Sequence, residues 1–267
     1  MPTTAAREDR AYATKDGSIG WLTFENPARL NAISGAMIAE AIDIIRDFSQ
    51  DPDIRTVIMR GAGEKAFISG GDISKFEETR FKTPAAEQGE SPFDTLRRDL
   101  SALEKPLIAM IHGYCLGGGM GVALCADLRF GTPTAQMGIP AALRGVAYPL
   151  DGLKPLVDLV GPSRAKDIMM TGRRMKADEA FQLGLLNRIF TPETLEDETR
   201  AYAQTLADNA PLSVKAAKVF IDQLGLEPAK RDHPRIKAMG LEARDSEDFR
   251  EATRSFMEKR KPVFKGR

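Results

Sequence analysis

The chain has 267 residues, of which 42% are hydrophobic and 28% charged, a composition typical of a folded globular protein with a substantial core. Lys and Arg total 38, as do Asp and Glu, so there is no net charge to hold nucleic acid or an anionic membrane non-specifically. Two cysteines are too few for a disulfide framework, and neither an apolar leader nor a membrane-length apolar run occurs, so we expect a cytoplasmic protein with reduced thiols.

The first part of the chain alternates β-type and helical patterns. Residues 19–24 (IGWLTF) and 54–60 (IRTVIMR) are short β-branched, aromatic and aliphatic runs that end in turn residues, which predicts two strands. Between them Ser34 is a good helix N-cap, and apolar residues follow at spacings of three and four: Ile38, Ala41, Ile42, Ile45 and Phe48. This spacing predicts a helix that packs on the sheet.

A second group of elements surrounds a glycine-rich segment. Ser91, Pro92 and Asp94 have the residue types that open a helix, after a polar stretch at 77–88 that we expect to be a surface loop. Residues 107–113 (LIAMIHG) form a nearly all-apolar run suited to a buried strand. A glycine-rich turn and a short helix over 118–126 should follow.

The remaining pattern shifts from mixed to helical. Residues 127–131 and 186–190 predict further strands, and a helix from Pro149 should end where Gly161 and Pro162 break it. From residue 193 onward the pattern is helical almost throughout. The sequence therefore predicts an α/β core domain over 1–194 and a C-terminal helical region over 195–267.

Two glycine-containing turns are the main candidates for chemistry. Residues 66–73 (AFISGGDI) and 111–124 (IHGYCLGGGMGVAL) each follow a predicted strand and enter a helix. Glycine lets a backbone N–H approach a ligand without a β-carbon in the way, and two amides that converge on one oxygen form an oxyanion hole. A single glycine-rich turn more often serves packing alone, whereas the pair in this order is far more specific.

Both turns match patterns of a known superfamily. The sequence resembles the crotonase (enoyl-CoA hydratase/isomerase) superfamily, whose members show A-F-S-x-G-x-D-[IL] and later [NH]-G-x-x-x-G-G-G, and the resemblance runs from about Ile19 to residues 258–264 (EKRKPVF). It implies the crotonase α/β fold, a spiral of ββα units with C-terminal helices that assemble trimers or hexamers. It also implies an acyl-coenzyme A thioester substrate, an enolate intermediate, no permanently bound cofactor and no metal.

The resemblance assigns roles to particular residues. It places the two oxyanion amides on Gly71 and Gly118 and gives Asp72 a structural capping role. Coenzyme contacts are implied for Ala28, Arg29, Leu30, Ser69, Gly71, Asp72 and Ile73. Near the C-terminus, Lys261 and Phe264 match a lysine and an aromatic residue that help to hold the coenzyme, often in a neighbouring subunit. Arg29 is equally well explained as a solvated surface charge, and the C-terminal residues as a frayed basic tail.

The sequence departs from the hydratases of the superfamily at two positions. These enzymes use one glutamate two residues after the triple glycine and another about twenty residues later. Gly121 and Ala141 occupy the matching positions here, and neither side chain can transfer a proton. We therefore expect hydration to be poor or absent unless other groups substitute.

Two residues downstream could take over proton transfer. Tyr148 lies in residues 145–148 (GVAY), which resemble the G-V-P-Y of methylmalonyl-CoA decarboxylase, although that enzyme has a histidine where Gly71 stands here. Asp151 lies near the aspartate of some isomerases and dehalogenases of the superfamily, or is simply an acid favoured at a helix N-terminus. Decarboxylase-like or isomerase-like chemistry is thus favoured, with hydration through substitute groups, hydrolysis, dehalogenation and acyl-CoA binding without catalysis as alternatives.

Other reactive residue types have plainer explanations. His112 at a predicted strand end is most simply a hydrogen-bonded structural group. Cys115 and Cys125 lie among apolar neighbours, which indicates buried, inert thiols. RNA binding, known for one branch of the superfamily, is disfavoured by the balanced charge.

Overall fold

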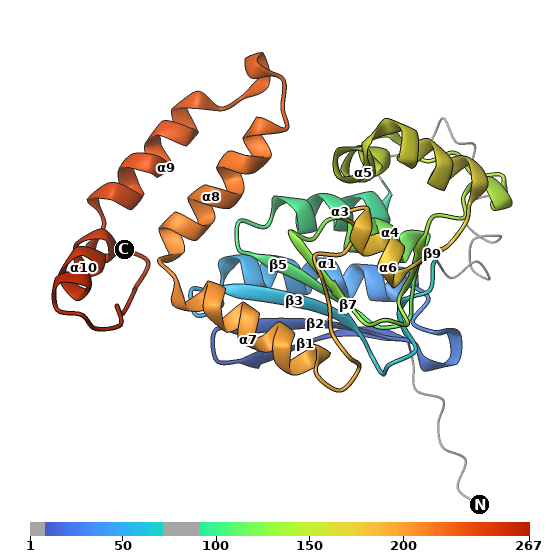
Figure 1. The fold of residues 1–267 in the computed structure, drawn as a ribbon, viewed down its shortest axis with the longest axis horizontal. Helices are drawn as coiled ribbons and strands as arrows, with labels where there is room; N and C mark the ends of the chain where they lie inside the picture. Colours follow the sequence, from blue (N-terminus) through green and yellow to red (C-terminus); the bar gives the residue numbers. More distant parts are fainter. Residues whose placement is uncertain (1–8, 72–90) are drawn as a thin grey trace, which may run out of the picture.

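Two β-sheets form the core of the computed structural model, which describes residues 9–71 and 91–267 (Figure 1). The larger sheet has the order β1-β2-β3-β5-β7-β10, with β1 Arg10–Asp16, β2 Ile19–Glu25, β3 Thr56–Gly61, β5 Leu107–Ile111, β7 Leu128–Gly131 and β10 Arg188–Ile189. The smaller sheet has the order β4-β6-β8-β9, with β4 Ala66–Ile68, β6 Tyr114–Leu116, β8 Gln136–Gly138 and β9 Met175–Lys176.

The chain alternates between the two sheets as it advances. β3 is followed by β4, β5 by β6 and β7 by β8, so each repeat adds one strand to each sheet. Strands from successive repeats pair in parallel. In the larger sheet β3 pairs with β5, with Ile58 opposite Ile108, and in the smaller sheet β6 pairs with β8, with Cys115 opposite Met137. The predicted spiral of ββα units is therefore present, and both glycine turns follow strands of the smaller sheet.

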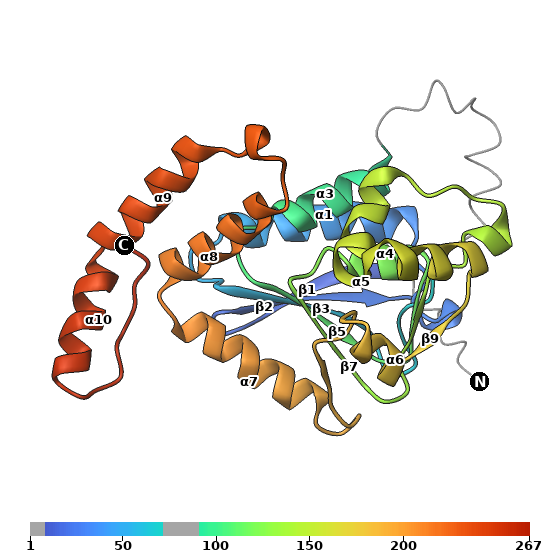
Figure 2. The ribbon, with the colours of Figure 1, turned by 45° about the horizontal axis from the view of Figure 1, so that its top comes forward.

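Helices cover both faces of the larger sheet. The bounds of the helices are α1 Gly35–Gln50, α3 Pro92–Ala102, α4 Gly118–Ala123, α5 Leu150–Thr171, α6 Ala177–Gln182, α7 Leu195–Asp208, α8 Pro211–Leu224, α9 His233–Asp245 and α10 Glu247–Met257. Figure 2 shows α1 and α3 on one face of the sheet and α7 on the other.

The local signals that predicted these helices act as expected. The Ser34 hydroxyl accepts a hydrogen bond from the amide of Met37 at 3.3 Å, and the Ser91 hydroxyl accepts one from the amide of Asp94 at 3.1 Å, so both serines are N-caps. The predicted apolar face of α1 is buried, apart from the half-buried Ile38. At Gly161 the backbone turns non-helical (φ 76°, ψ 164°), so α5 is two helical segments that meet at a kink.

Some strands have no clear signal in the sequence. Ala11 is the only buried residue of β1, whose other side chains are half-buried or exposed, so the strand shows little hydrophobic alternation. β8 and β9 have three and two residues, too few to display a period. These elements form because neighbouring strands supply hydrogen-bond partners, which sequence patterning does not reveal.

The C-terminal helices divide into two groups. α7 packs on the larger sheet, where Leu195 and Ala203 join a buried cluster with Trp21, Ile108 and Phe130. The first helix of the expected C-terminal region thus belongs to the core by its packing. α9 and α10 instead project from the core, while α8 lies beside it, where the Lys218 ammonium donates to the main-chain oxygen of Lys105 at 3.0 Å and to the Asp127 carboxylate at 2.9 Å (Figures 1 and 2).

The last residues return from α10 toward the core. The Arg55 guanidinium donates to the main-chain oxygens of Phe264 at 2.8 Å and of Ala207 at 3.1 Å. These bonds fix the C-terminal segment to the junction between α7 and α8. In the part of the chain that the structure describes, none of the helices combines the length and apolarity needed to cross a bilayer.

Candidate active site

The first glycine turn follows β4 and is hydrogen-bonded to the segment that the resemblance assigns to coenzyme binding. The Ser69 amide donates to the main-chain oxygen of Leu30 at 3.2 Å, and the Ser69 hydroxyl donates to that of Arg29 at 3.0 Å. The Ile33 amide donates to the Gly70 oxygen at 2.8 Å. Residues 28–33 and 69–71 therefore form one hydrogen-bonded unit, in which Ala28, Arg29 and Leu30 are exposed.

Asn31 holds this unit on the core and was not predicted as a site residue. Leu30 and Asn31 both adopt left-handed backbone conformations, with φ values of 51° and 57°. The buried Asn31 amide group donates to the oxygens of Ala62 at 2.9 Å and Ala66 at 2.8 Å, and its oxygen accepts from the Asn26 amide at 3.0 Å. Asparagine tolerates the left-handed region, so the L-N-A segment itself carried a signal for this role.

The three consecutive glycines of the second turn have different surroundings, and two of them are required by the backbone or by close packing. Gly117 has φ 54° and ψ −116°, a conformation that residues with a β-carbon rarely adopt. Gly119 packs α4 against β4, because a β-carbon there would overlap the main-chain oxygen of Ile68. Gly118 has room for a methyl group, so neither strain nor tight packing explains the glycine at this position.

The two turns face each other. A methyl group built on Gly118 would lie 3.7 Å from the amide nitrogen of Gly71, and one built on Gly117 would lie 3.9 Å from the α-carbon of Gly70. Among the described residues, no acceptor receives a hydrogen bond from the amide of Gly71 or Gly118. The structure thus brings together the two amides predicted to form an oxyanion hole.

An aromatic ring and a phenol line the adjoining space. Ring atoms of Phe93, on the first turn of α3, lie 3.4 Å from a methyl group built on Gly118. The Tyr148 hydroxyl donates to the Gly117 oxygen at 3.1 Å and lies 3.6 Å from a methyl group built on Gly121. A phenol with its ordinary pKa of 10 is protonated at neutral pH, and burial raises the pKa of Tyr148 further. Phe93 was not predicted, since only the tertiary packing of α3 on α4 brings it here.

Asp151 occupies a less enclosed position than Tyr148. It lies on the first turn of α5 and is exposed, while its main-chain oxygen accepts a hydrogen bond from the Arg97 guanidinium at 2.7 Å. This bond ties α3 to α5, and within α3 Arg97 also lies 3.5 Å from a carboxylate oxygen of Asp94. Gly121 and Ala141, the positions matched to the hydratase glutamates, are both buried.

Lys261 and Phe264 lie far from the glycine turns of the same chain. Both belong to the C-terminal segment, at the opposite end of the molecule from α4 and α5 (Figure 1). Lys261 forms a 2.5 Å ion pair with Asp208, and the Phe264 oxygen is bonded to Arg55. In a single chain these two residues therefore lie away from the candidate oxyanion amides.

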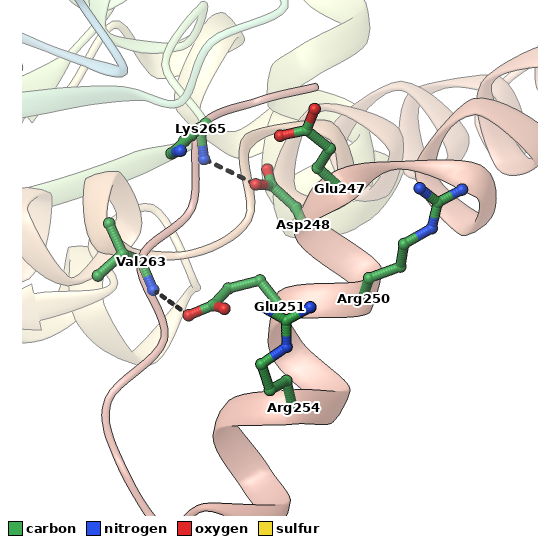
Figure 3. A pocket seen from close by; sticks show the side chains of 7 residues that line it. All are labelled: Glu247, Asp248, Arg250, Glu251, Arg254, Val263 and Lys265. Carbon is green, nitrogen blue, oxygen red and sulfur yellow. Dashed lines mark hydrogen bonds between the residues drawn. The ribbon is translucent and has the colours of Figure 1, made fainter.

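A pocket beside the C-terminal segment serves to hold that segment. Figure 3 shows Asp248 and Glu251 of α10 pointing toward the returning chain, with Asp248 bonded to the Lys265 amide at 2.7 Å and Glu251 to the Val263 amide at 3.1 Å. The hydrogen bond from Arg260 lowers the pKa of Glu251 to about 2. These carboxylates are thus hydrogen-bond acceptors for the C-terminal segment.

The remaining candidate residues are buried or half-buried, or lie outside the residues that the structure describes. Asp72 and Ile73 lie outside the described residues. Burial raises the pKa values of the Cys115 and Cys125 thiols, which agrees with inert cysteines. Burial lowers the pKa of His112. No group of three or more potential metal-ligating side chains occurs within residues 9–71 and 91–267.

The two interleaved sheets and the facing glycine turns define a crotonase-type α/β protein. A solved structure of an enoyl-CoA hydratase/carnithine racemase from Magnetospirillum magneticum superposes with a TM-score of 0.91 at 31% identity and covers 97% of both chains. An enoyl-CoA hydratase subunit from Geobacillus kaustophilus superposes with a TM-score of 0.87 at 33% identity, covering 96% of this chain and 98% of that one. The predicted fold class is confirmed.

Sequence comparison then gives the family. Residues 14–267 match the enoyl-CoA hydratase/isomerase family. A carnitinyl-CoA dehydratase from Citrobacter koseri is 34% identical over 260 residues, 96% of this chain and 98% of that protein. A short-chain-enoyl-CoA hydratase from Clostridium acetobutylicum is 33% identical over 250 residues, 92% of this chain and 94% of that protein. The chain belongs to the enoyl-CoA hydratase/isomerase family of the crotonase superfamily, which confirms the resemblance.

Proposed function

We propose that the chain binds an acyl-CoA thioester with its carbonyl oxygen between the amides of Gly71 and Gly118 and stabilises the enolate formed there. The observation that carries this proposal is the approach of the two turns, with the Gly71 nitrogen 3.7 Å from the β-carbon position of Gly118. Amides aimed at an oxygen that gains negative charge lower the barrier, and removing one such donor costs about 10²–10³ in rate.

The coenzyme part of the substrate would lie along the first hydrogen-bonded unit. The exposed Ala28, Arg29 and Leu30 adjoin Ser69 through two hydrogen bonds and so reach the turn that carries Gly71. Arg29 is suited to a phosphate group because its guanidinium is always charged. Coenzyme A enters as part of the substrate, and no permanently bound cofactor is proposed.

Decarboxylase-like or isomerase-like chemistry fits these residues better than hydration. Hydration needs a base and an acid on the adding water, and Gly121 and Ala141 provide neither. In a decarboxylation the bond from the α-carbon to the carboxylate would break, its electron pair would enter the enolate, and CO2 would leave. The Tyr148 hydroxyl would then protonate the α-carbon and regain its proton from water.

In an isomerisation Asp151 would remove a proton from the α-carbon and return one to the γ-carbon. The exposed first turn of α5 leaves its carboxylate free to meet a substrate. Tyr148, protonated at neutral pH, would remain a hydrogen-bond donor throughout. Both reactions therefore share one enolate sink and differ in which group moves the proton.

Hydration or dehydration through substitute groups is the second candidate. It is favoured by the names of relatives that are 33–34% identical over more than nine tenths of the chain. Tyr148 and Asp151 would then supply the acid and the base. Acyl-CoA binding without catalysis is the remaining alternative.

The C-terminal helices favour assembly into trimers or hexamers. α9 and α10 project from the core, and Leu241, Phe249, Phe256 and Met257 on them are exposed, with Phe256 at 82%. A second copy could cover these side chains and receive Lys261 and Phe264 near its coenzyme site. Light scattering coupled to size-exclusion chromatography measures the number of subunits.

The experiment that tests the proposed reaction is a substrate panel. Crotonyl-, methylmalonyl-, ethylmalonyl- and 3-enoyl-CoA would be incubated with wild type, Tyr148→Phe and Asp151→Asn, and products separated by mass spectrometry. CO2 release from the malonyl-type thioesters, lost in Tyr148→Phe, supports decarboxylation. Conversion of the 3-enoyl thioester, lost in Asp151→Asn, supports isomerisation.

The same panel separates the alternatives. Crotonyl-CoA hydration that survives in both variants would show that other groups transfer the protons. Binding of the thioesters without turnover of any would favour a non-catalytic binding protein. Failure of all four to bind would contradict the proposed site itself.

A further inference from the structure

The two peptide units that carry the candidate amides have differently bonded carbonyl groups. The Gly71 N–H belongs to the Gly70–Gly71 peptide, whose oxygen accepts a hydrogen bond from the Ile33 amide at 2.8 Å. The Gly118 N–H belongs to the Gly117–Gly118 peptide, whose oxygen accepts two hydrogen bonds. One comes from the Gly121 amide at 3.0 Å and the other from the Tyr148 hydroxyl at 3.1 Å.

A hydrogen bond on a peptide oxygen changes the N–H at the other end of the same peptide. The peptide is a resonance unit, so a donor at the oxygen draws electrons from nitrogen toward it and makes the N–H a stronger donor. This cooperative strengthening is about 10–30% per bond in condensed-phase estimates. The Gly118 amide therefore benefits from a phenol that the Gly71 amide lacks.

The surroundings of Tyr148 hold its hydroxyl in this position. Its ring lies against the first turn of α5, where ring atoms are 3.1 and 3.3 Å from a methyl group built on Gly152. Its oxygen lies 3.6 Å from a methyl group built on Gly121, an ordinary van der Waals distance, so the hydroxyl adjoins the position matched to the first hydratase glutamate. The phenol carries the proton that the hydrogen bond requires, since its ordinary pKa is 10 and partial burial raises it.

We infer that Tyr148 is a positioning residue that orients and strengthens the Gly118 amide through the Gly117 carbonyl. This inference rests on the proposed function, because the amide matters only if a thioester oxygen binds to it. It gives Tyr148 a role that does not require proton transfer to the substrate. The role follows from the bond to Gly117 and is the same for every reaction that passes through the enolate.

The test measures the polarisation of a bound thioester directly. Butyryl-CoA labelled with ¹³C at the thioester carbon is saturated and carries no carboxylate, so it can neither add water nor lose CO2. Its carbonyl stretch, isolated by isotope-edited infrared spectroscopy, falls when hydrogen bonds to the oxygen strengthen. We expect a lower frequency on wild type than in solution, and a partial return toward the solution value on Tyr148→Phe.

Kinetics on the 3-enoyl thioester, in whose isomerisation Asp151 rather than Tyr148 would move the proton, should agree where wild type converts it. Tyr148→Phe should lower kcat about tenfold, less than loss of a whole donor, and change KM by less than about twofold. Tyr12→Phe, which removes a hydroxyl from β1, is the matched control and should change neither the carbonyl stretch nor kcat. A Tyr148→Phe carbonyl frequency equal to that of wild type would overturn the inference.

If Tyr148→Phe does not fold, replacing Tyr148 with 3-fluorotyrosine tests the same hydrogen bond. A more acidic phenol donates a stronger hydrogen bond, so 3-fluorotyrosine, at a pH where it is protonated, should lower the carbonyl frequency below that of wild type. Raising the pH until it ionises removes the proton and should reverse the shift. Absence of both effects contradicts the inference, whereas a wild-type protein that binds butyryl-CoA without any carbonyl shift contradicts the proposed function.

Discussion

Gly119 lies so close to Ile68 that a β-carbon at position 119 would overlap the main-chain oxygen of Ile68. The obstacle is backbone rather than the end of a flexible side chain, so α4 or β4 would have to move. Gly119→Ala should therefore lower the free energy of unfolding by about 2 kcal/mol or more, measured by urea denaturation. Gly35→Ala is the control, because nothing lies within 4 Å of a methyl group there. Equal stabilities of the two variants would refute the close packing of α4 on β4.

Gly118→Ala tests the oxyanion hole without this packing cost. The added methyl group would lie 3.4 Å from Phe93 and 3.7 Å from the Gly71 nitrogen, between the two amides. We expect kcat/KM for a converted thioester to fall about 100-fold while the urea midpoint changes little. Undiminished activity with the methyl group in place would mean that the carbonyl oxygen binds elsewhere.

Asp151→Asn tests the proposed base on α5. The amide side chain keeps the size of the carboxylate but cannot accept a proton at neutral pH. Isomerisation of a 3-enoyl-CoA should fall about 10²–10⁴-fold, with little effect on stability because Asp151 is exposed. Asp158→Asn, on the same helix and ion-paired with Lys154 at 2.5 Å, is the control and should retain full activity. Comparable losses in both variants would point to a general effect of charge on α5.

His112 should make the protein less stable in mild acid. Burial lowers its pKa below the ordinary value of 6.5, so the unfolded chain takes up a proton more readily than the folded protein. The free energy of unfolding should fall as the pH drops through about 6.5 toward the lowered value, by at most about 1.4 kcal/mol at pH 5.5, the limit for an imidazole that stays neutral in the folded protein. Urea titrations at about pH 7.5 and about pH 5.5 measure the loss, which His112→Asn should reduce.

The effect of His112 on stability can be separated from that of Glu251, because the two groups titrate over different pH ranges. Glu251, whose pKa Arg260 lowers to about 2, stabilises the folded protein above about pH 4.5, and that contribution is lost only as the pH falls from there toward 2. It is therefore constant over the measured interval. An identical pH dependence in wild type and His112→Asn would show that His112 ionises equally in the folded and unfolded states.

Asp248 should anchor the C-terminal segment. It is 2% exposed and accepts hydrogen bonds from the amides of Lys265 and Gly266, both at 2.7 Å. Asn has one acceptor oxygen where Asp has two, so Asp248→Asn should cost about 1.5–3 kcal/mol locally and speed removal of the last residues by carboxypeptidase. Asp245→Asn, at an exposed position, is the control and should be digested at the wild-type rate. Digestion of Asp248→Asn at the wild-type rate would show that other contacts hold the segment.

The sequence predicted the elements whose signals are local. Helix α1 was found from its cap and its spacing, and the glycines at 71 and 118 from a motif that the structure brings together. β1 escaped notice because its stability comes from pairing with β2 along its whole length, with Arg10 opposite Glu25 and Asp16 opposite Ile19. No property of residues 10–16 alone reveals that pairing.

The same distinction applies within the candidate site. Tyr148 was singled out from a short local match, but its partner Gly117 lies 31 residues earlier and is reached only because the segment before α5 folds over the start of α4. Phe93 likewise reaches Gly118 only through tertiary packing, because α3 lies beside α4. Lys261 and Phe264 were placed beside the coenzyme by resemblance, and in a single chain they bind Asp208 and Arg55 instead.

The hydrogen-bond donors to the Gly70 and Gly117 oxygens differ in whether a substitution can remove them. The bond from Ile33 uses a main-chain N–H, which every residue except proline supplies, so almost any substitution there leaves the donor in place. The bond from Tyr148 uses a side chain, which a single nucleotide change to phenylalanine abolishes. During evolution the second amide can therefore be adjusted on its own, while the first is inherited with the backbone.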